Sequence, residues 1–165
     1  MRHAESSNDY RDLVDHDRPL NARGQSDSPH VADALAERGW LPQLVLVSSS
    51  TRTLETLEVM ALHIEGARAD IRPEIYHAGI SALLIQLEDM LDEGTTMILG
   101  HNPGSEVLIN HLTGEWHTMP PAAAALLAES GGDWSIEDIS PPRELDYRRS
   151  GSRMVTAPSS SPLGI

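Results

Sequence analysis

The sequence predicts an α/β fold, a three-layer α/β/α sandwich in which helices cover both faces of a mostly parallel central sheet. Short apolar runs alternate with amphipathic segments along the chain, in the order strand, helix, strand, helix. The runs at 43–47 (QLVLV) and 95–100 (TTMILG) are nearly continuous in apolar residues, which is typical of strands buried on both faces. With 165 residues, the chain is long enough to form one domain with a buried core.

The first half of the chain supplies a loop, two helices and one of these strands. Residues 7–24 are polar and rich in turn-forming residues, so they predict a long functional loop. Apolar residues recur at helical spacing over 25–38 and again over 48–64, where serines can cap the helix start. Gly39 ends the first of these helices, and the strand at 43–47 separates the two.

The second half continues the alternation. Residues 69–76 predict a short strand that ends in a loop, and 80–94 predict an amphipathic helix that Gly94 closes. The strand at 95–100 follows, and 105–114 predict a further helix that ends at Gly114.

Two late strands are expected at 122–129 and 133–139, joined as an antiparallel hairpin, although the alanine-rich first segment fits a helix equally well. From residue 141 the chain is polar and rich in Ser, Pro and Arg. The expected organisation is a catalytic domain over 1–140 and a loosely ordered tail over 141–165.

Composition excludes several classes of function. Asp and Glu outnumber Lys and Arg by 25 to 12, and a net charge of -13 repels nucleic acid and anionic membranes. The absence of cysteine excludes disulfides, thiolate nucleophiles and cysteine-based zinc sites. No apolar run is long enough to span a bilayer, and no signal peptide is visible, so a cytoplasmic protein is expected.

Four residues with cationic or imidazole side chains are expected to meet in one crevice. Arg2 and His3 open the chain, Arg52 follows the strand at 43–47, and His101 follows the strand at 95–100. In open α/β sheets, ligands bind outside the carboxyl ends of the strands. Arginines match a phosphoryl group with rigid forks of donors, and a neutral histidine is a nucleophile.

Such a set needs no metal and no cofactor, because phosphoryl transfer depends mainly on positioning and charge neutralisation. Neither a carboxylate cage nor a pair of histidines at zinc spacing is visible.

The ordered motifs resemble the histidine phosphatase superfamily. They are RHAES (2–6), RPLNARG (18–24), SSSTRTLET (48–56), GHNPG (100–104) and MPPAAAALL (119–127). They look most like its short, bacterial phosphohistidine phosphatase branch, and the resemblance runs from residue 1 to about residue 138. It implies a phosphoglycerate mutase-like fold.

The resemblance also implies individual roles. His3 takes the phosphoryl group, while Arg2, Arg52 and His101 hold its oxygens through the transition state. The expected activity is that of a metal-independent phosphatase with a phosphohistidine intermediate, acting first of all on protein phosphohistidine. The alternatives are a small-molecule phosphomonoesterase and a non-catalytic phosphate-binding relative. A phosphorylated substrate is the expected partner.

Three further residues have less definite roles. Asn8 and Arg18 are expected at the mouth of the pocket, and Glu74 is the candidate proton donor. A proton donor contributes about 100- to 10,000-fold for a poor leaving group, and it matters less for phosphohistidine, whose imidazole leaves readily once protonated. The remaining histidines are expected to be exposed or half-buried and not to be ligands; they are His16, His30, His63, His77, His111 and His117.

One feature departs from the family pattern. The resemblance implies an apolar strand immediately before the RHA motif, in the middle of the sheet, and here only Met1 precedes Arg2. A misassigned start site accounts for this most simply. This departure is what favours the non-catalytic alternative.

Overall fold

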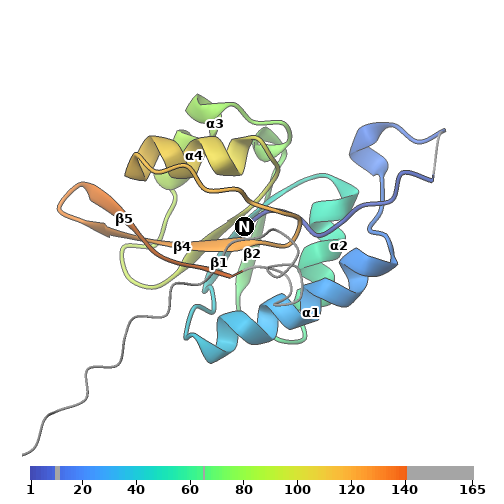
Figure 1. The fold of residues 1–165 in the computed structure, drawn as a ribbon, viewed down its shortest axis with the longest axis horizontal. Coiled ribbons are helices and arrows are strands. Elements are labelled where there is room, and N and C mark those ends of the chain that lie inside the picture. Colours follow the sequence, from blue (N-terminus) through green and yellow to red (C-terminus); the bar gives the residue numbers. More distant parts are fainter. Residues whose placement is uncertain (10–11, 65, 141–165) are drawn as a thin grey trace, which may run out of the picture.

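The computed structural model describes residues 1–9, 12–64 and 66–140, and it confirms the three-layer α/β arrangement (Figure 1). Helices α1 (Ala22–Glu37) and α2 (Thr51–Met60) lie on one side of the central sheet. Helices α3 (Ile80–Leu87) and α4 (Gly104–Thr113) lie on the other. The predicted tail at 141–165 falls outside the described residues.

The central sheet is parallel, as predicted. Its strands are β1 (Leu44–Ser48), β2 (Arg68–Arg72) and β3 (Thr96–Leu99), in the order β2-β1-β3. All five residues of β1 are buried, which explains the continuous apolar run. Because the three strands run in the same direction, their carboxyl ends lie at one edge of the sheet.

Strands β4 (Ala124–Ser130) and β5 (Asp133–Ser140) form the predicted antiparallel hairpin, so the helical alternative for 122–129 is wrong. Positive φ angles at Gly131 and Gly132 allow the tight turn between the two strands.

Three helices differ in their bounds from the predicted ones. Helix α2 spans Thr51–Met60 instead of 48–64, and the other two differ for local reasons. Helix α1 starts before residue 25 because the Asn21 side chain caps it, accepting a hydrogen bond from the Gly24 N–H at 2.8 Å. Helix α3 ends well before Gly94, since the N–H groups of residues 88–90 bond three residues back and tighten the chain into turns.

The predicted strand at 69–76 is also shorter than expected. Strand β2 ends at Arg72, and a 3-10 turn over Pro73–Ile75 follows it. Pro73 has no N–H with which to continue the ladder, and it fits the first position of the turn.

The side chains of β1 alternate between two apolar clusters. Val45 and Val47 pack toward the cluster that includes Leu35 of α1, whereas Leu44 and Leu46 join the cluster that includes Leu83 of α3. Burying each such side chain contributes about 1.5–3 kcal/mol, so the helices on both sides are held to one strand.

The first three residues lie between β3 and β4. Arg2 forms a parallel bridge with Gly100, and its N–H donates to the Ala123 carbonyl at 3.0 Å. The Met1 ammonium nitrogen donates to the Ile98 carbonyl at 2.8 Å, and burial lowers its pKa to about 5. Residues 1–3 therefore join the parallel sheet to the hairpin.

A cavity of about 830 Å³ borders Met1 between the same two strands. Its walls include residues 95–98 on the β3 side and 124–129 on the β4 side. Side chains from both helical layers also line it, Leu35 from α1 and Leu83 from α3 among them. The cavity thus lies in the plane of the sheet, beside Met1 and between the two strands that residues 1–3 join.

This cavity predicts the effect of adding residues before Met1. An extension of about five alternating valines and leucines is expected to raise the melting temperature by at least about 4 °C, on the order of 1–2 kcal/mol for this size. The reason is that such a strand would pair with β3 and β4 and bury side chains against both helical layers. Thermal unfolding followed by circular dichroism measures the shift.

An extension of equal length made of glycine and serine is the matched control, since it removes the buried ammonium without adding apolar side chains. Equal melting temperatures for the two extended proteins would contradict the prediction.

Candidate active site

The structure brings three of the four predicted residues into direct proximity at the carboxyl edge of the sheet. The ring centroids of His3 and His101 are 5.1 Å apart, and Arg52 Nη2 lies 3.5 Å from His101 Nδ1. All three residues are buried, although each is polar or charged. Burial of such groups is costly unless they are paired, which makes this cluster the candidate site.

Arg2 borders the same site through its chain neighbour His3. Its Nη1 donates to the Met119 carbonyl at 2.9 Å, and its Nε is buried without a partner among the described residues. Its positive charge contributes to the low pKa of His3. Arg2 thus adds a second guanidinium with an unused donor.

His3 is held in one tautomer. Its Nδ1 lies 2.6 Å from the Ala4 carbonyl oxygen, which can only accept, so Nδ1 carries the proton and Nε2 carries the lone pair. Burial, together with the charges of Arg52 and Arg2, lowers the pKa of His3 to about 4. At neutral pH the imidazole is therefore uncharged and nucleophilic.

His101 is fixed by a serine that sequence reasoning did not single out. His101 Nε2 lies 2.8 Å from the Ser48 hydroxyl at the end of β1. Burial and the neighbouring His3 and Arg52 lower the pKa of His101 to about 3. His101 is thus a neutral hydrogen-bonding group beside Arg52.

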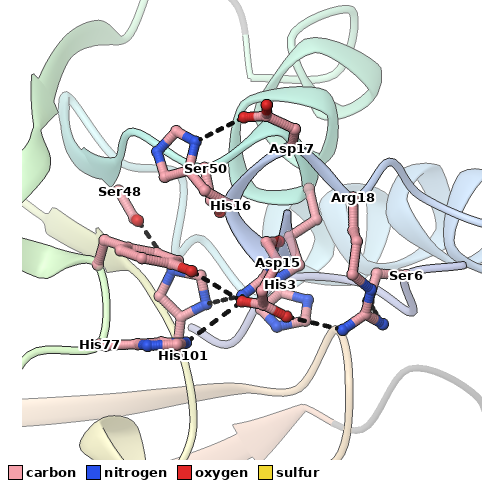
Figure 2. A network of polar contacts seen from close by, with 12 residues as sticks. His3, Ser6, Asp15, His16, Asp17, Arg18, Ser48, Ser50, His77 and His101 are labelled. Carbon is pink, nitrogen blue, oxygen red and sulfur yellow. Dashed lines mark hydrogen bonds and ion pairs between the residues drawn. The ribbon is translucent and has the colours of Figure 1, made fainter. Parts of the chain in front are cut away.

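Arg52 lies in the first turn of α2 and is held by Asp15. Its Nη1 donates to the Asp15 backbone carbonyl at 2.6 Å, and its Nη2 donates to Asp15 Oδ2 at 3.0 Å. The same carboxylate accepts from Arg18 and from the Tyr76 hydroxyl, each at 2.8 Å. Figure 2 shows Asp15 at the centre of this network. Partial burial opposes ionisation, but hydrogen bonds from Tyr76, Arg18 and Arg52 hold the pKa of Asp15 well below its usual range.

Arg18 and Asn8 contact each other, with Arg18 Nη2 donating to Asn8 Oδ1 at 2.5 Å. Arg18 also donates to the Ser7 carbonyl and to Asp15, so its guanidinium ties the loop after His3 to the site. Glu74 is exposed in the turn after β2, and the described part of the chain offers it no hydrogen bond or ion pair.

Sequence reasoning missed a group of residues on the outer side of the pocket. Tyr76 stacks on His77 with centroids 4.1 Å apart, and His16 meets the edge of the Tyr76 ring at 4.9 Å. The His77 ring lies 6.0 Å from that of His101. His16 and His77 are indeed half-buried and exposed, as expected, yet both lie at the site. Arg52 and His101 were identified because they follow the carboxyl ends of parallel strands. The same rule applies to Tyr76 and His77, which follow β2.

The described residues offer neither a metal site nor a membrane-spanning helix. No group of three or more His, Cys, Asp or Glu side chains there is arranged to hold a metal ion. Nor does any helix in the described ranges have the length and apolar character needed to cross a membrane.

Comparison with known sequences finds no matching family model. An uncharacterized chloroplastic protein of Arabidopsis thaliana is 39% identical over 81% of this chain and 66% of its own length. An uncharacterized protein of Mycobacterium tuberculosis is 31% identical over 66% of each chain. The chain thus spans 66% of the length of these relatives. Because one of these relatives is a plant chloroplast protein, the expected bacterial origin and cytoplasmic location do not follow from these matches.

Solved structures give a more specific likeness. A proposed phosphohistidine phosphatase SixA from Agrobacterium tumefaciens superposes with a TM-score of 0.79 at 26% identity, covering 86% of this chain and 95% of that one. The protein histidine phosphatase SixA in complex with tungstate gives 0.77 at 24% identity, covering 86% and 94%.

In fold, the chain matches the histidine phosphatase superfamily, with its phosphoglycerate mutase-like architecture. Within the superfamily, the proteins that it resembles in the comparisons above carry the name SixA.

The buried imidazoles predict a pH-dependent stability. In the unfolded chain His3 and His101 have pKa values near 6.5, but in the folded protein these fall to about 4 and about 3. The unfolded state therefore binds more protons between pH 7 and pH 5, and folding stability falls as pH falls through this range. The expected loss is on the order of 1–3 kcal/mol, measured as a lower urea midpoint at pH 5. The Met1 amine acts in the same direction.

A His3→Asn, His101→Asn double variant is the control, and its urea midpoint should depend less on pH. A wild-type midpoint that is equal or higher at pH 5 would show that these imidazoles are not buried as neutral groups.

Proposed function

We propose that this protein is a phosphatase that works through a phosphohistidine intermediate at His3. The observation that carries the proposal is the neutral His3 imidazole, with its Nε2 lone pair, in a buried cluster with Arg52 and His101. A nucleophile beside groups that bind oxyanions is what such chemistry requires.

The residues divide the reaction into two steps. In the first, His3 Nε2 attacks phosphorus, the bond from phosphorus to the leaving group breaks, and the leaving group takes a proton. In the second, water attacks the phosphohistidine and releases phosphate, which restores the neutral imidazole.

The guanidinium groups of Arg2 and Arg52 meet the negative charge on the equatorial oxygens, and the neutral His101 imidazole adds a hydrogen-bonding group beside Arg52. Arg52 stands at the start of α2, where free backbone N–H groups also favour an anion. These donors supply the neutralisation for which other enzymes use a metal ion, so we propose that the reaction needs none.

Protein phosphohistidine is the substrate class that we favour. The support is the likeness to structures whose names give that activity. A second support is chemical. Glu74, the candidate acid in the sequence, forms no hydrogen bond or ion pair among the described residues, and phosphohistidine depends less on such an acid because imidazole leaves comparatively well.

Replacement of the nucleophile tests the mechanism. His3→Ala is expected to lower kcat for 4-nitrophenyl phosphate by on the order of 1,000-fold or more, because it removes the group that becomes phosphorylated. His63→Ala is a matched control, since His63 pairs with Asp33 at the far end of α2. EDTA should leave the wild-type rate unchanged. Activity that survives in His3→Ala, or that EDTA abolishes, would contradict the mechanism.

A comparison of substrates tests the class. A phosphohistidine-bearing protein is expected to give a higher kcat/KM than sugar phosphates or nucleotides, measured as phosphate release. The reverse order would identify a small-molecule phosphomonoesterase, and no release from any substrate would favour a non-catalytic phosphate-binding protein.

A further inference from the structure

His77 occupies a constrained position at the outer wall of the pocket. Its backbone has φ 51°, in the left-handed region that residues with a side chain seldom adopt. Such conformations persist where the surroundings impose them, and they concentrate at functional sites. Here Tyr76 stacks on one face of the His77 ring at 4.1 Å and 15°.

Asp15 links His77 to the phosphate-binding residues. His77 Nε2 lies 3.4 Å from Asp15 Oδ2, the same oxygen that accepts from Arg52 Nη2 (Figure 2). The His77 ring lies 6.0 Å from that of His101, and its side chain is 61% exposed. His77 is thus oriented by the Asp15 carboxylate, lies close to His101, and is accessible to the leaving group of a bound substrate.

Resting on the phosphatase function proposed above, we propose that His77, oriented by Asp15, is the proton donor to the leaving group. As the bond from phosphorus to the leaving oxygen or nitrogen breaks, the His77 imidazolium gives one ring proton to that atom. His77 is left neutral. In the second step, neutral His77 takes a proton from the attacking water, so atoms and charges balance over one turnover.

The other candidates near the pocket fit this role less well. Asp15 is a carboxylate with four partners, and the hydrogen bonds from three of them, Tyr76, Arg18 and Arg52, keep its pKa too low for it to carry a proton. Glu74 has no hydrogen bond or ion pair in the described part of the chain that would orient it. An imidazole is also the group that most readily exchanges a proton near neutral pH.

A series of aryl phosphates, from 4-nitrophenyl phosphate to phenyl phosphate, provides the test. His77→Asn is the main variant, because asparagine tolerates the left-handed backbone and cannot transfer a proton. It is expected to lower kcat/KM for phenyl phosphate by about 100-fold and for 4-nitrophenyl phosphate by only a few-fold, because the better leaving group needs no donor. His63→Ala should leave the dependence on the leaving group as in the wild type.

Chemical rescue separates a proton donor from a purely structural residue. In His77→Gly the backbone is accommodated and the side chain is removed, so added imidazole should restore activity toward phenyl phosphate. A structural role would give no such rescue.

Three outcomes would overturn the assignment. They are an equal loss across the series in His77→Asn, no loss at all, or the same selective loss in Glu74→Gln instead. The proposed function fails separately, through retained activity in His3→Ala.

Discussion

The site depends on the backbone hydrogen bonds that hold His3 between two segments distant in sequence. The His3 N–H donates to the Gly100 carbonyl at 3.0 Å, and the Ala122 N–H donates to the His3 carbonyl at 2.9 Å. These bonds place His3 beside His101, whose loop starts at Gly100. Fixing a side chain costs conformational entropy, which these bonds help to offset, and positioning within about 0.5 Å is needed for efficient reaction.

The chemistry at this point follows from desolvation. The imidazoles of His3 and His101 are buried beside Arg52, so both stay neutral well below the pH at which exposed histidines become charged. The chain as a whole carries a net charge of -13, yet the immediate surroundings of His3 are cationic. At a separation of a few ångströms a buried guanidinium outweighs distant surface carboxylates, which solvent and salt screen.

Asp15 connects Arg52 to the Tyr76 and His77 side of the candidate site. Its carboxylate accepts from Arg18, Arg52 and Tyr76 and lies 3.4 Å from His77 Nε2, so one side chain orients residues from three separate segments. Charge-assisted hydrogen bonds of this kind are about twice as strong as neutral ones, and they fix the orientation of the Arg52 guanidinium.

The sequence by itself determined the fold class, the order of strands and helices, and the convergence of His3, Arg52 and His101. The fold class, the element order and the meeting of Arg52 and His101 follow from local patterns, namely apolar periodicity and the rule that parallel strands end at one edge. The place of His3 was implied by the resemblance of the RHAES motif to the histidine phosphatases. Only the tertiary structure decided which side chains already donate to protein groups, and Arg18 is one of them. It also decided which further polar residues lie at the candidate site, namely Asp15, Tyr76 and His77. The tautomer of His3 and the depressed pKa values were likewise hidden, because burial and hydrogen bonds arise between segments that sequence separation does not reveal.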